Sequence, residues 1–506
     1  MLSSHSRSNN ILLITNSEYG QASVFIALAY ELCTLTKHDT DSEFQIHIAS
    51  FDTLKPRISR LQQLLKSVNK GLENRVHFQP LPGVAHMDKL WSLVGGAKGL
   101  SHPPGLAGAV YNYRQMDACM APWTIEEYGE QLTVLEQIIT NTDPIAILVD
   151  NMYKPGTDVC EKMGKEYLVL SPNTGKEYAG NLQPYGQALW KYPVVSSGHA
   201  YPVPWYLIPL NIYLTFRLAL YVACSPRVKR MIEFRKEMEI PSSFFEFYKP
   251  DIPYLIASFP EADFPFVLPQ NVMSCGPMVL PVRPVIEQDP SLAKWLDERE
   301  TVMINLGSHV TSDTKLTRVL AGGIRILLSR NPNVQVLWKL KAQGEVYDAL
   351  RDLVGKEMDE GQVKAVSWLD VEPYAILEHE NTVCSVHHGG ANSYFEAVKA
   401  GVPQIVMPVW LDTYDFARRV GFLEIGVYGS KTSAPGADAE EFGQALLRVV
   451  GVSGVERGHG VRQSEAMSES KAFRRKALEL SRLGMSYTGR KKAAEVVLNH
   501  IVNKRA

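Results

Sequence analysis

The sequence predicts an α/β protein of two domains, each built on a parallel β-sheet with helices on both faces. Three observations predict this. The chain has 506 residues, which is more than one hydrophobic core usually holds. Short, continuous apolar runs alternate with helical patterns in both halves, and such runs are typical of strands buried on both faces. Between the halves, residues 274–291 are punctuated by proline without periodicity, which indicates a linker.

Composition and charge narrow the class of protein. Hydrophobic residues make up 45% and charged residues 21% of the chain, as in ordinary soluble globular proteins. The net charge of −2 gives no general attraction to a polyanion, so we expect no nucleic-acid partner. Six cysteines lie scattered without a Cys-x-x-Cys pair, and no Asn-x-Ser/Thr acceptor occurs. Both features fit a reducing compartment, so we expect a cytoplasmic location without disulfides or structural zinc.

In the N-terminal half, β-type runs and helical patterns follow one another along the chain. The first run, residues 11–15, is too short for the core of a signal peptide. The helical pattern "ASVFIALAYELCTL" comes next. Further strands are predicted at "FQIHIAS", "RVHFQPL", "AILVDNM" and "EYLVLSP". Residues 175–265 are rich in aromatic residues and proline, which predicts loops and helices inserted between strands.

The stretch "PWYLIPLNIYLTFRLALYVAC", residues 204–224, approaches the roughly 20 residues that a membrane span requires. Pro209, Asn211 and Arg217 interrupt it, and a central arginine costs roughly 2.5–3.5 kcal/mol to insert. We therefore expect a buried or membrane-touching helix pair rather than a span. Peripheral membrane association through 204–224 stays open.

The alternation of strands and helices restarts after the linker. Strands and helices are predicted at "TVMINLGS", "TRVLAGGIRILLSR", "VQVLWKL", "VKAVSWL", "TVCSVHH", "SYFEAVKAG" and "QIVMPV". The tail is basic, with leucines and valines at helical spacing, and predicts helices that pack on the body. The expected division is an N-terminal domain (1–277), a linker (278–298), a C-terminal domain (299–470) and C-terminal helices (471–506).

Residues 385–417 begin with a strand that ends at His387-His388, followed by two glycines and a helical pattern. The glycines permit close backbone approach. Asn392 and Ser393 are suitable N-cap residues, and Ser393 and Glu396 have the spacing of a capping box. Free N–H groups and the macrodipole make such a helix end attractive to anions. Capping alone would not require the histidines and glycines that precede it.

The strand after this helix, "QIVMPV", leads to Trp410 and Asp412. They are therefore placed at the carboxyl edge of the sheet, where open α/β sheets bind their ligands. The expected ligand is a phosphate held by the helix, with a hydroxyl-rich group beside Asp412.

Together these residues resemble the signature of a known family. "HHGGANSYFEAVKAGVPQIVMPVWLDTYDFA" resembles the signature of the inverting UDP-sugar glycosyltransferases, in a form that looks like the fungal branch acting on small lipophilic molecules. The match is dense from Trp368 to Ala417, and fainter at "INLGS" and around the first strand and helix. The resemblance implies the GT-B fold, two Rossmann-like domains facing a central cleft, with the acceptor in the N-terminal half. It implies transfer of a hexose, expected to be glucose, with inversion, to a hydroxylated secondary metabolite, polyketide, terpenoid or sterol.

The resemblance also implies roles for individual residues. Trp368 would stack on the uracil ring, and Glu396 would bind the ribose hydroxyls. The residues implied at the diphosphate are Gly307, Ser308, His388, Gly390, Asn392 and Ser393. Asp412, with Trp410 beside it, would hold sugar hydroxyls. No metal and no cofactor are expected, since the helix end with His388 and Ser308 can stabilise the departing UDP; the only Asp-x-Asp, at 39–41, is predicted to be a turn.

Four features depart from the family pattern. Trp368 lacks the Pro-Gln that usually follows it and lies two residues early, measured from His379. Thr413 stands where a Gln usually follows the sugar-binding Asp. Gln21 stands where the family has its catalytic His, and glutamine cannot act as a general base. Asp117 matches the downstream Asp that would orient this His, so Asp117 and Gln21 are the candidate catalytic pair.

The general base stays open at this point. The acceptor proton could go to Asp117 or to another group such as Glu18 or His86, or an acidic phenol acceptor could need little help. His86 and His102 lie in predicted loops and are expected to be surface histidines. An apolar acceptor pocket is expected from the aromatic middle region. Its residues are Tyr201, Trp205, Tyr206, Phe244, Phe245 and Phe247.

The expected partners are a UDP-sugar as co-substrate and a small lipophilic acceptor, with the oligomeric state open. Because Gln21 stands where the family has its catalytic His, a second class of protein stays open. It is a nucleotide-sugar-binding protein of the same fold with little or no transferase activity. Epimerisation of a nucleotide sugar is a further option on a related fold. A dehydrogenase is set aside because no Gly-x-Gly-x-x-Gly follows a strand.

Overall fold

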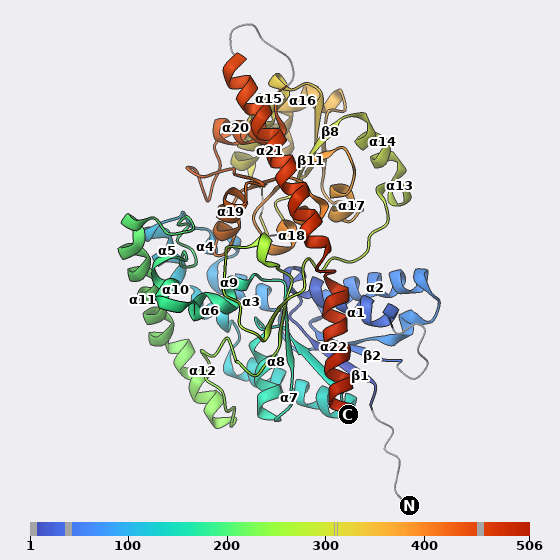
Figure 1. Ribbon diagram of the computed structural model, residues 1–506, viewed down its shortest axis with the longest axis vertical. Coiled ribbons are helices and arrows are strands. Elements are labelled where there is room, and N and C mark those ends of the chain that lie inside the picture. Colours follow the sequence, from blue (N-terminus) through green and yellow to red (C-terminus); the bar gives the residue numbers. More distant parts are fainter. Residues whose placement is uncertain (1–7, 36–42, 308, 311, 453–459, 506) are drawn as a thin grey trace, which may run out of the picture.

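The structure is a computed structural model that describes residues 8–35, 43–307, 309–310, 312–452 and 460–505. It contains two parallel sheets, one in each half of the chain, and Figure 1 shows the two halves one above the other. The predicted α/β class with two Rossmann-like domains is confirmed by this architecture.

The first sheet has the strand order β3-β2-β1-β4-β5-β6-β7, with parallel neighbours throughout. Its strands are β1 (Asn10–Ile14), β2 (Gln45–Ser50), β3 (Val76–Pro80), β4 (Ala146–Val149), β5 (Leu168–Ser171), β6 (Tyr254–Ile256) and β7 (Val272–Ser274). Ile11 and Leu13 of β1 belong to the core on one face, whereas Leu12 and Ile14 belong to the core on the other. Burial on both faces explains why the run is apolar at successive positions.

The second sheet has the order β10-β9-β8-β11-β12-β13, again with parallel neighbours. Its strands are β8 (Glu300–Ile304), β9 (Val334–Lys339), β10 (Val363–Val366), β11 (Thr382–His387), β12 (Gln404–Val406) and β13 (Gly426–Tyr428). In both sheets the strand order reverses in the middle, between β1 and β4 and between β8 and β11. These reversals are the switch points at which doubly wound sheets bind ligands.

Helices connect the strands and cover both sheets (Figure 1). Those of the first half are α1 (Tyr19–Leu35), α2 (Lys55–Val68), α3 (His86–Val94), α4 (Ala97–Leu100), α5 (Leu106–Tyr113), α6 (Met116–Met120), α7 (Ile125–Thr142), α8 (Lys154–Lys162), α9 (Gly175–Ala179), α10 (Gln187–Trp190), α11 (Ile208–Cys224) and α12 (Pro226–Glu237). Those of the second half are α13 (Val285–Gln288), α14 (Pro290–Glu298), α15 (Thr314–Arg330), α16 (Glu345–Asp359), α17 (Pro373–Leu377), α18 (Ala391–Ala400), α19 (Thr413–Phe422), α20 (Ala439–Val450), α21 (Gly460–Met485) and α22 (Arg490–Arg505).

The region between the sheets is only partly extended. After β7 the chain runs without regular structure to α13, and α13 and α14 follow. Val285, Leu292 and Trp295 of these helices are buried with Met303 of β8 and Leu337 of β9. Residues 285–298 therefore contribute to the core of the second sheet.

The C-terminal helices tie the two halves together. α21 packs on α18 and α20, and α22 crosses to the first half and packs on α1. Ala493, Val497 and Ile501 of α22 join the core of the first sheet. Arg490 donates from Nε to Glu31 Oε2 at 2.7 Å, and both side chains are mostly buried.

A buried interface also joins the two sheets' domains directly. Arg419 of α19 donates from Nε to Asp263 Oδ1 at 2.8 Å, with both side chains almost inaccessible to solvent. The hydroxyl of Tyr394 in α18 donates to the carbonyl of Ala262 at 2.7 Å. These contacts fix α18 and α19 against the N-terminal half.

Candidate active site

The second switch point lies where β8 and β11 end side by side. β8 leads into Asn305, Leu306 and Gly307, and β11 leads into His388. Gly307 has φ +86°, a backbone conformation that side-chain-bearing residues rarely adopt. The tight turn after β8 and the histidine after β11 are thereby brought to one edge of the sheet.

His388 lies between two glycines. A Cβ atom on Gly307 would approach Cε1 of the His388 ring to 2.8 Å, and a Cβ on Gly390 would approach it to the same distance. Only glycine leaves room for the ring on both sides. Nδ1 of His388 is buried, with no hydrogen-bond partner among the described residues. Burial, followed by the neighbouring His387 and His309, lowers the pKa of His388 to about 3, so the ring is neutral at physiological pH.

His387, the first histidine of the pair, has a structural role. It is buried, its Nε2 donates to Gln404 Oε1 at 2.8 Å, and its Nδ1 accepts from the backbone N–H of Gly389 at 3.1 Å. Gln404 belongs to the adjacent strand β12. His387 therefore anchors the loop that presents His388.

Helix α18 begins earlier than predicted, at Ala391, with Gly390 as the N-cap in an extended conformation. The prediction that Asn392 and Ser393 cap the helix was therefore wrong, and no side chain in the described chain caps its first turn. Ser393 lies half-buried in this turn. The C-terminal prediction was correct, because Gly401 ends the helix with φ 73°. An uncapped helix start beside His388 offers N–H groups and a positive dipole end to an anion.

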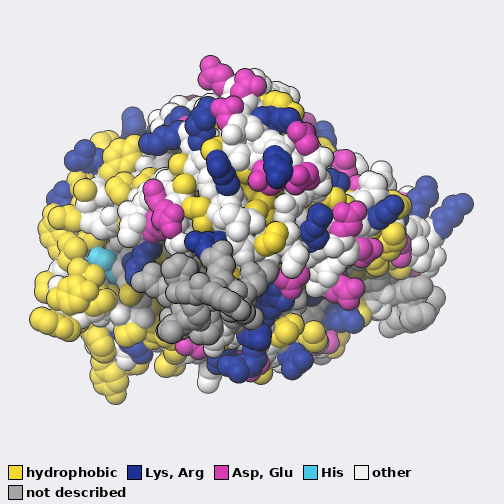
Figure 2. Space-filling model, turned by 90° about the horizontal axis from the view of Figure 1, so that it is seen from above, with side chains coloured by type: hydrophobic (Ala, Val, Ile, Leu, Met, Phe, Trp, Pro, Cys, Tyr) yellow, Lys and Arg dark blue, Asp and Glu magenta, His cyan; other side chains and the backbone are white. Residues whose placement is uncertain are grey.

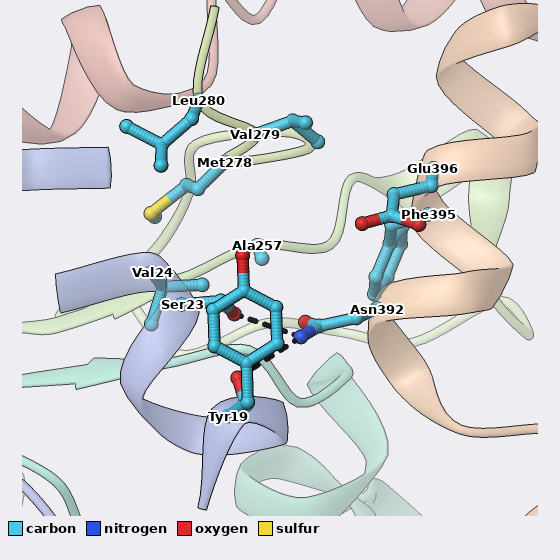
Figure 3. A pocket seen from close by; sticks show the side chains of 10 residues that line it. All are labelled: Tyr19, Ser23, Val24, Ala257, Met278, Val279, Leu280, Asn392, Phe395 and Glu396. Carbon is cyan, nitrogen blue, oxygen red and sulfur yellow. Dashed lines mark hydrogen bonds between the residues drawn. The ribbon is translucent and has the colours of Figure 1, made fainter. Parts of the chain in front are cut away.

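Asn392 turns towards the other domain. Its Nδ2 donates to the carbonyl of Tyr19 at 3.2 Å and to Ser23 Oγ at 2.8 Å (Figure 3). Both acceptors belong to α1. The residue predicted to contact a phosphate thus also links the two halves of the chain.

Glu396 lies one turn further along α18, beside a cavity between the two domains. The cavity is lined by Tyr19, Ser23, Val24, Ala257, Met278, Val279, Leu280, Asn392, Phe395 and Glu396 (Figure 3). Burial, followed by the charge of Glu372, raises the pKa of Glu396 to about 8. At neutral pH this carboxyl group is largely protonated, so it can both donate to and accept from the hydroxyl groups of a ligand.

Trp368 follows strand β10 and remains half exposed, at 49%. The Nζ atom of Lys339, at the end of β9, lies over its ring at 4.4 Å from the centroid. The ring therefore has a cation on one side, and its exposed area is large enough to receive a planar group.

Trp410 and Asp412 lie in the turn after β12. Trp410 is 9% exposed, and its ring centre lies 6.2 Å from that of His388 and 6.1 Å from that of Trp91 in the other domain. Burial, followed by Glu177 and Asp415, raises the pKa of Asp412 to about 7.

Thr413 holds this turn. Its Oγ1 accepts from the backbone N–H groups of Val409 and Trp410, at 3.1 Å each, and donates to the Trp410 carbonyl. Since the side chain is buried and engaged, Thr413 positions Asp412 instead of presenting a group to a ligand.

The candidate catalytic pair of the N-terminal half is not joined. Gln21 lies in the first turn of α1, and its Oε1 is buried without a hydrogen-bond partner in the described chain. Asp117, in α6, accepts from Ser225 Oγ at 2.6 Å and from the N–H of Ala118 at 2.7 Å. Oδ2 of Asp117 is thus engaged at the N-cap of α12 and Oδ1 within α6, and no hydrogen bond joins Asp117 to Gln21 in the described chain.

A different pair spans the two switch points. Glu18, in the loop after β1, places Oε2 3.2 Å from Nε2 of His309, in the loop after β8. The His309 ring also packs against Trp91, at 5.6 Å between ring centres. His309 and Trp91 were missed from the sequence. The available signal was a histidine directly after the Gly307-Ser308 turn.

The expectation that His86 and His102 are surface histidines was wrong. His86 is 7% exposed, donates from Nε2 to the Cys119 carbonyl at 3.1 Å and packs on Trp123; burial lowers its pKa to about 4. His102 is 1% exposed and accepts from the N–H of Leu411 at Nε2, at 3.3 Å. His102 therefore links the loop before α5 to the turn that carries Asp412.

The expected aromatic acceptor pocket is also wrong as drawn from the sequence. Phe244 is buried in the core of the first domain, and Tyr201 stacks on Phe264 at 4.5 Å. Trp205 and Tyr206 are 81% and 64% exposed on the outside. The side chains that face Trp410 across the domain interface come from α3 and its surroundings, with Leu90, Leu100 and Cys119 among them.

Two predicted features lie outside the described residues: Ser308 and the Asp39-Thr40-Asp41 turn. Among the described residues, no group of three or more His, Cys, Asp or Glu side chains is placed to hold a metal ion.

Two Rossmann-like sheets and an uncapped helix end beside a glycine-flanked histidine define a nucleotide-sugar glycosyltransferase of the GT-B type. Residues 358–472 match the C-terminal domain of the erythromycin biosynthesis protein CIII-like family. The chain is 37% identical over 479 residues to glycosyltransferase sdnJ of Sordaria araneosa, covering 88% of this chain and 91% of that one. It is 26% identical over 260 residues to a UDP-glycosyltransferase of Talaromyces amestolkiae, covering 49% and 45% of the two chains.

Among solved structures, a UDP-glucosyltransferase from Polygonum tinctorium superimposes with a TM-score of 0.61 and 18% identity, over 98% of both chains. The chain belongs to the UDP-glycosyltransferase family. The predicted family, fold and enzyme class are confirmed.

Proposed function

We propose that this enzyme transfers a hexose, with UDP-glucose as the expected donor, to a hydroxyl group of a small lipophilic secondary metabolite, with inversion at the anomeric carbon. The observation that carries the proposal is the neutral His388 ring, held between Gly307 and Gly390 with an unpartnered nitrogen beside the uncapped start of α18. This arrangement suits a diphosphate, and the names of the related proteins support the class of acceptor: one matching family is of erythromycin biosynthesis.

The donor would lie along α18. The diphosphate would meet His388 and the first turn of the helix, where Ser393 lies, and the ribose would meet Glu396. The uracil would stack on the open side of Trp368. Asp412, positioned by Thr413, would accept hydroxyl donors from the sugar. Each assignment pairs a group with the polarity that it requires.

We further infer that His309 is the general base and that Glu18 orients it. A hydrogen on Nε2 faces the Glu18 carboxylate at 3.2 Å, and this tautomer places the proton-accepting lone pair on Nδ1. In the transfer step, the acceptor oxygen forms a bond to the anomeric carbon, and the bond from that carbon to the UDP oxygen breaks. The acceptor proton passes to His309, and the electron pair leaves with UDP, where the helix end and His388 stabilise the charge.

The pair of Glu18 and His309 provides the general base that Gln21 cannot provide. Gln21 motivated the alternative of a binding protein without transferase activity, because glutamine cannot take a proton. With Glu18 and His309 in place between the two domains, Gln21 is free to position the acceptor hydroxyl through its unpartnered Oε1. Asp117 would then support the fold through Ser225.

The compartment is proposed to be the cytoplasm. All six cysteines, each within the described chain, carry free thiols, which suits a reducing environment.

Incubation of the purified enzyme with UDP-sugars and a panel of lipophilic phenols and alcohols tests the proposed function. We expect a product heavier by one hexose in mass spectra, formed fastest with UDP-glucose, and a β-linked sugar in NMR spectra from the α-linked donor. Hydrolysis or epimerisation of the donor without a glycosylated product would contradict the proposal, and an α-linked product would contradict inversion.

A further inference from the structure

Helix α11 exposes its apolar side to solvent. Tyr213, Phe216 and Leu220 are 48%, 63% and 53% exposed. Their spacing of three and four residues places them on one side of the helix. The stretch Trp205–Cys224 is long and apolar enough to cross a membrane, yet only 17% of it is buried.

The side of α11 that faces the protein carries the polar residue. Asn211 is fully buried, donates from Nδ2 to the carbonyls of Leu189 and Tyr192 at 2.9 and 3.0 Å, and accepts from the N–H of Val194. Leu214, also fully buried, packs beside it. Val222 is buried on the same side. The helix is thus apolar on both its buried and its exposed side, whereas a surface helix of a protein in water usually exposes a polar side.

Neighbouring segments extend this surface. α5 and α10 both pack on α11. We call the exposed apolar side chains of α5, α10, α11 and the turns that lead into α10 and α11 the apolar face: Leu106, Tyr111, Leu182, Tyr185, Trp190, Trp205, Tyr206, Tyr213, Phe216 and Leu220. In Figure 2 hydrophobic side chains gather at the left end of the molecule, the side on which Figure 1 places α5, α10 and α11. A contiguous face of this kind marks an interaction surface.

The segments that carry the apolar face contain charged residues of one sign only. Residues 178–232 contain no aspartate or glutamate, although acidic residues outnumber basic ones in the whole chain, 54 to 52. The basic residues of this segment are Lys191, Arg217, Arg227, Lys229 and Arg230. Residues 89–116, which include α5, also lack acidic residues and contain Lys89, Lys98 and Arg114. Lys229 and Arg230 are exposed near the start of α12, which follows α11.

We propose that the apolar face is a membrane-binding surface that lies in the interface of a bilayer carrying anionic lipids. Tryptophan and tyrosine favour the level of the lipid headgroups, and the surrounding cations match anionic phosphates. A second copy of the chain docked face to face would bring the cations of both copies together. The helix lies on the membrane and does not span it, because Asn211 and Leu214 belong to the folded domain.

Vesicle flotation with the full-length enzyme tests the proposal. We expect binding to vesicles of phosphatidylcholine with phosphatidylserine, and at least tenfold weaker binding to phosphatidylcholine alone or to the mixed vesicles at high salt. The variant Phe216→Ser/Leu220→Ser should lose at least tenfold in binding to both kinds of vesicle. Lys229→Glu/Arg230→Glu should lose mainly the preference for anionic lipid.

A matched control is Leu483→Ser in α21, which removes a leucine that is 50% exposed in the other half of the molecule. It should bind vesicles like the parent enzyme. UDP affinity, measured by calorimetry, verifies that each variant is folded. Absence of vesicle binding by the parent enzyme would overturn the proposal. So would a dimer, seen by light scattering, that Phe216→Ser/Leu220→Ser dissociates, since the apolar face would then be an interface between copies.

Discussion

At the first switch point, the carboxyl ends of β1 and β4 are closed by polar side chains that satisfy one another. Asp150 is fully buried and accepts from Asn16 Nδ2 at 2.8 Å, from Thr15 Oγ1 at 3.3 Å and from the N–H of Met152 at 2.9 Å. Asn16 in turn accepts from the N–H of Glu18 just before α1. We call this the sealed switch point, because the polar side chains directly at the two strand ends are paired with one another.

At the second switch point, between β8 and β11, some polar groups have no partner in the described chain, and we call it the open switch point. His388 has an unpartnered Nδ1, its neighbours are glycines, and α18 starts without a side-chain cap in the described chain. The first six strands of each sheet follow the same order, so the difference comes from a few side chains. The strand order places both edges where a ligand could bind, and the side chains at each edge determine whether unpaired polar groups remain to bind it.

The largest effect on activity is expected from Glu18 and His309, the pair that bridges the two switch points. His309→Ala should lower kcat about 10²- to 10⁴-fold, because the acceptor proton then lacks a base. KM for the UDP-sugar should change little. Steady-state kinetics with an aliphatic alcohol and with a phenol measures this, and the phenol should lose less because its hydroxyl is more acidic.

Asp117→Asn is the matched control for His309→Ala. Since the Asp117 carboxylate is engaged by Ser225, we expect kcat within a few-fold of the parent enzyme on both acceptors. The kcat of Glu18→Gln should lie between those of Asp117→Asn and His309→Ala. If Asp117→Asn abolished transfer to the alcohol while His309→Ala did not, Asp117 would be the base and the bridging pair would be structural.

The next largest effect should come from the open switch point itself. His388→Ala should lower kcat about 10²- to 10³-fold, the loss typical when one donor to a developing negative charge is removed. UDP affinity should fall in parallel, as measured by calorimetry. Asn16→Ala makes the corresponding change at the sealed switch point and should lower thermal stability while leaving UDP affinity unchanged. Undiminished UDP affinity in His388→Ala would remove the diphosphate from this site.

These residues also mark what the sequence could reveal. The sheets and the donor edge were predictable because continuous apolar strands, paired glycines and a following helical pattern are local signals. The start of α18 was not, since Asn392 and Ser393 favour N-cap positions, yet the extended backbone at Gly390 begins the helix before them. The contact of Asn392 with α1 outweighs the intrinsic preference of asparagine for the N-cap position.

Contacts between the domains were beyond the sequence for a related reason. Glu18 and His309 come from different sheets, and only the packing of the two halves brings them together. The burial of His102 against Leu411 arises in the same way. The exposed aromatic residues around α11 show the opposite error: composition cannot tell a pocket lining from an outer surface.

A smaller effect is expected at Trp368, on the rim of the open edge. Trp368→Ala should raise KM for the UDP-sugar roughly 10- to 100-fold, in line with about 1–3 kcal/mol for stacking of a base. Trp368→Phe keeps an aromatic face and should recover most of this loss, whereas kcat should hardly change in either variant. An unchanged KM in Trp368→Ala would place the uracil elsewhere.

The smallest effect belongs to the sealed switch point and concerns stability alone. Burial raises the pKa of Asp150 to about 6, above the usual value of roughly 3.9 in an unfolded chain. Between these values the folded protein binds more protons than the unfolded one. The contribution of this group to stability is therefore complete below about pH 4 and declines as the pH rises through 6, with a slope of at most about 1.4 kcal/mol per pH unit.

Asp150→Asn removes this titration. The difference in unfolding free energy between the parent enzyme and the variant, from denaturant titrations, should fall between about pH 4 and 6 and stay level above 7. UDP affinity of the variant at pH 7.5 should equal that of the parent, because Asp150 closes an edge that no donor enters. A pH-independent difference in stability would contradict the raised pKa of Asp150. A loss of UDP affinity would show that the sealed switch point also takes part in binding the donor. The two switch points would then not differ in the way their side chains indicate.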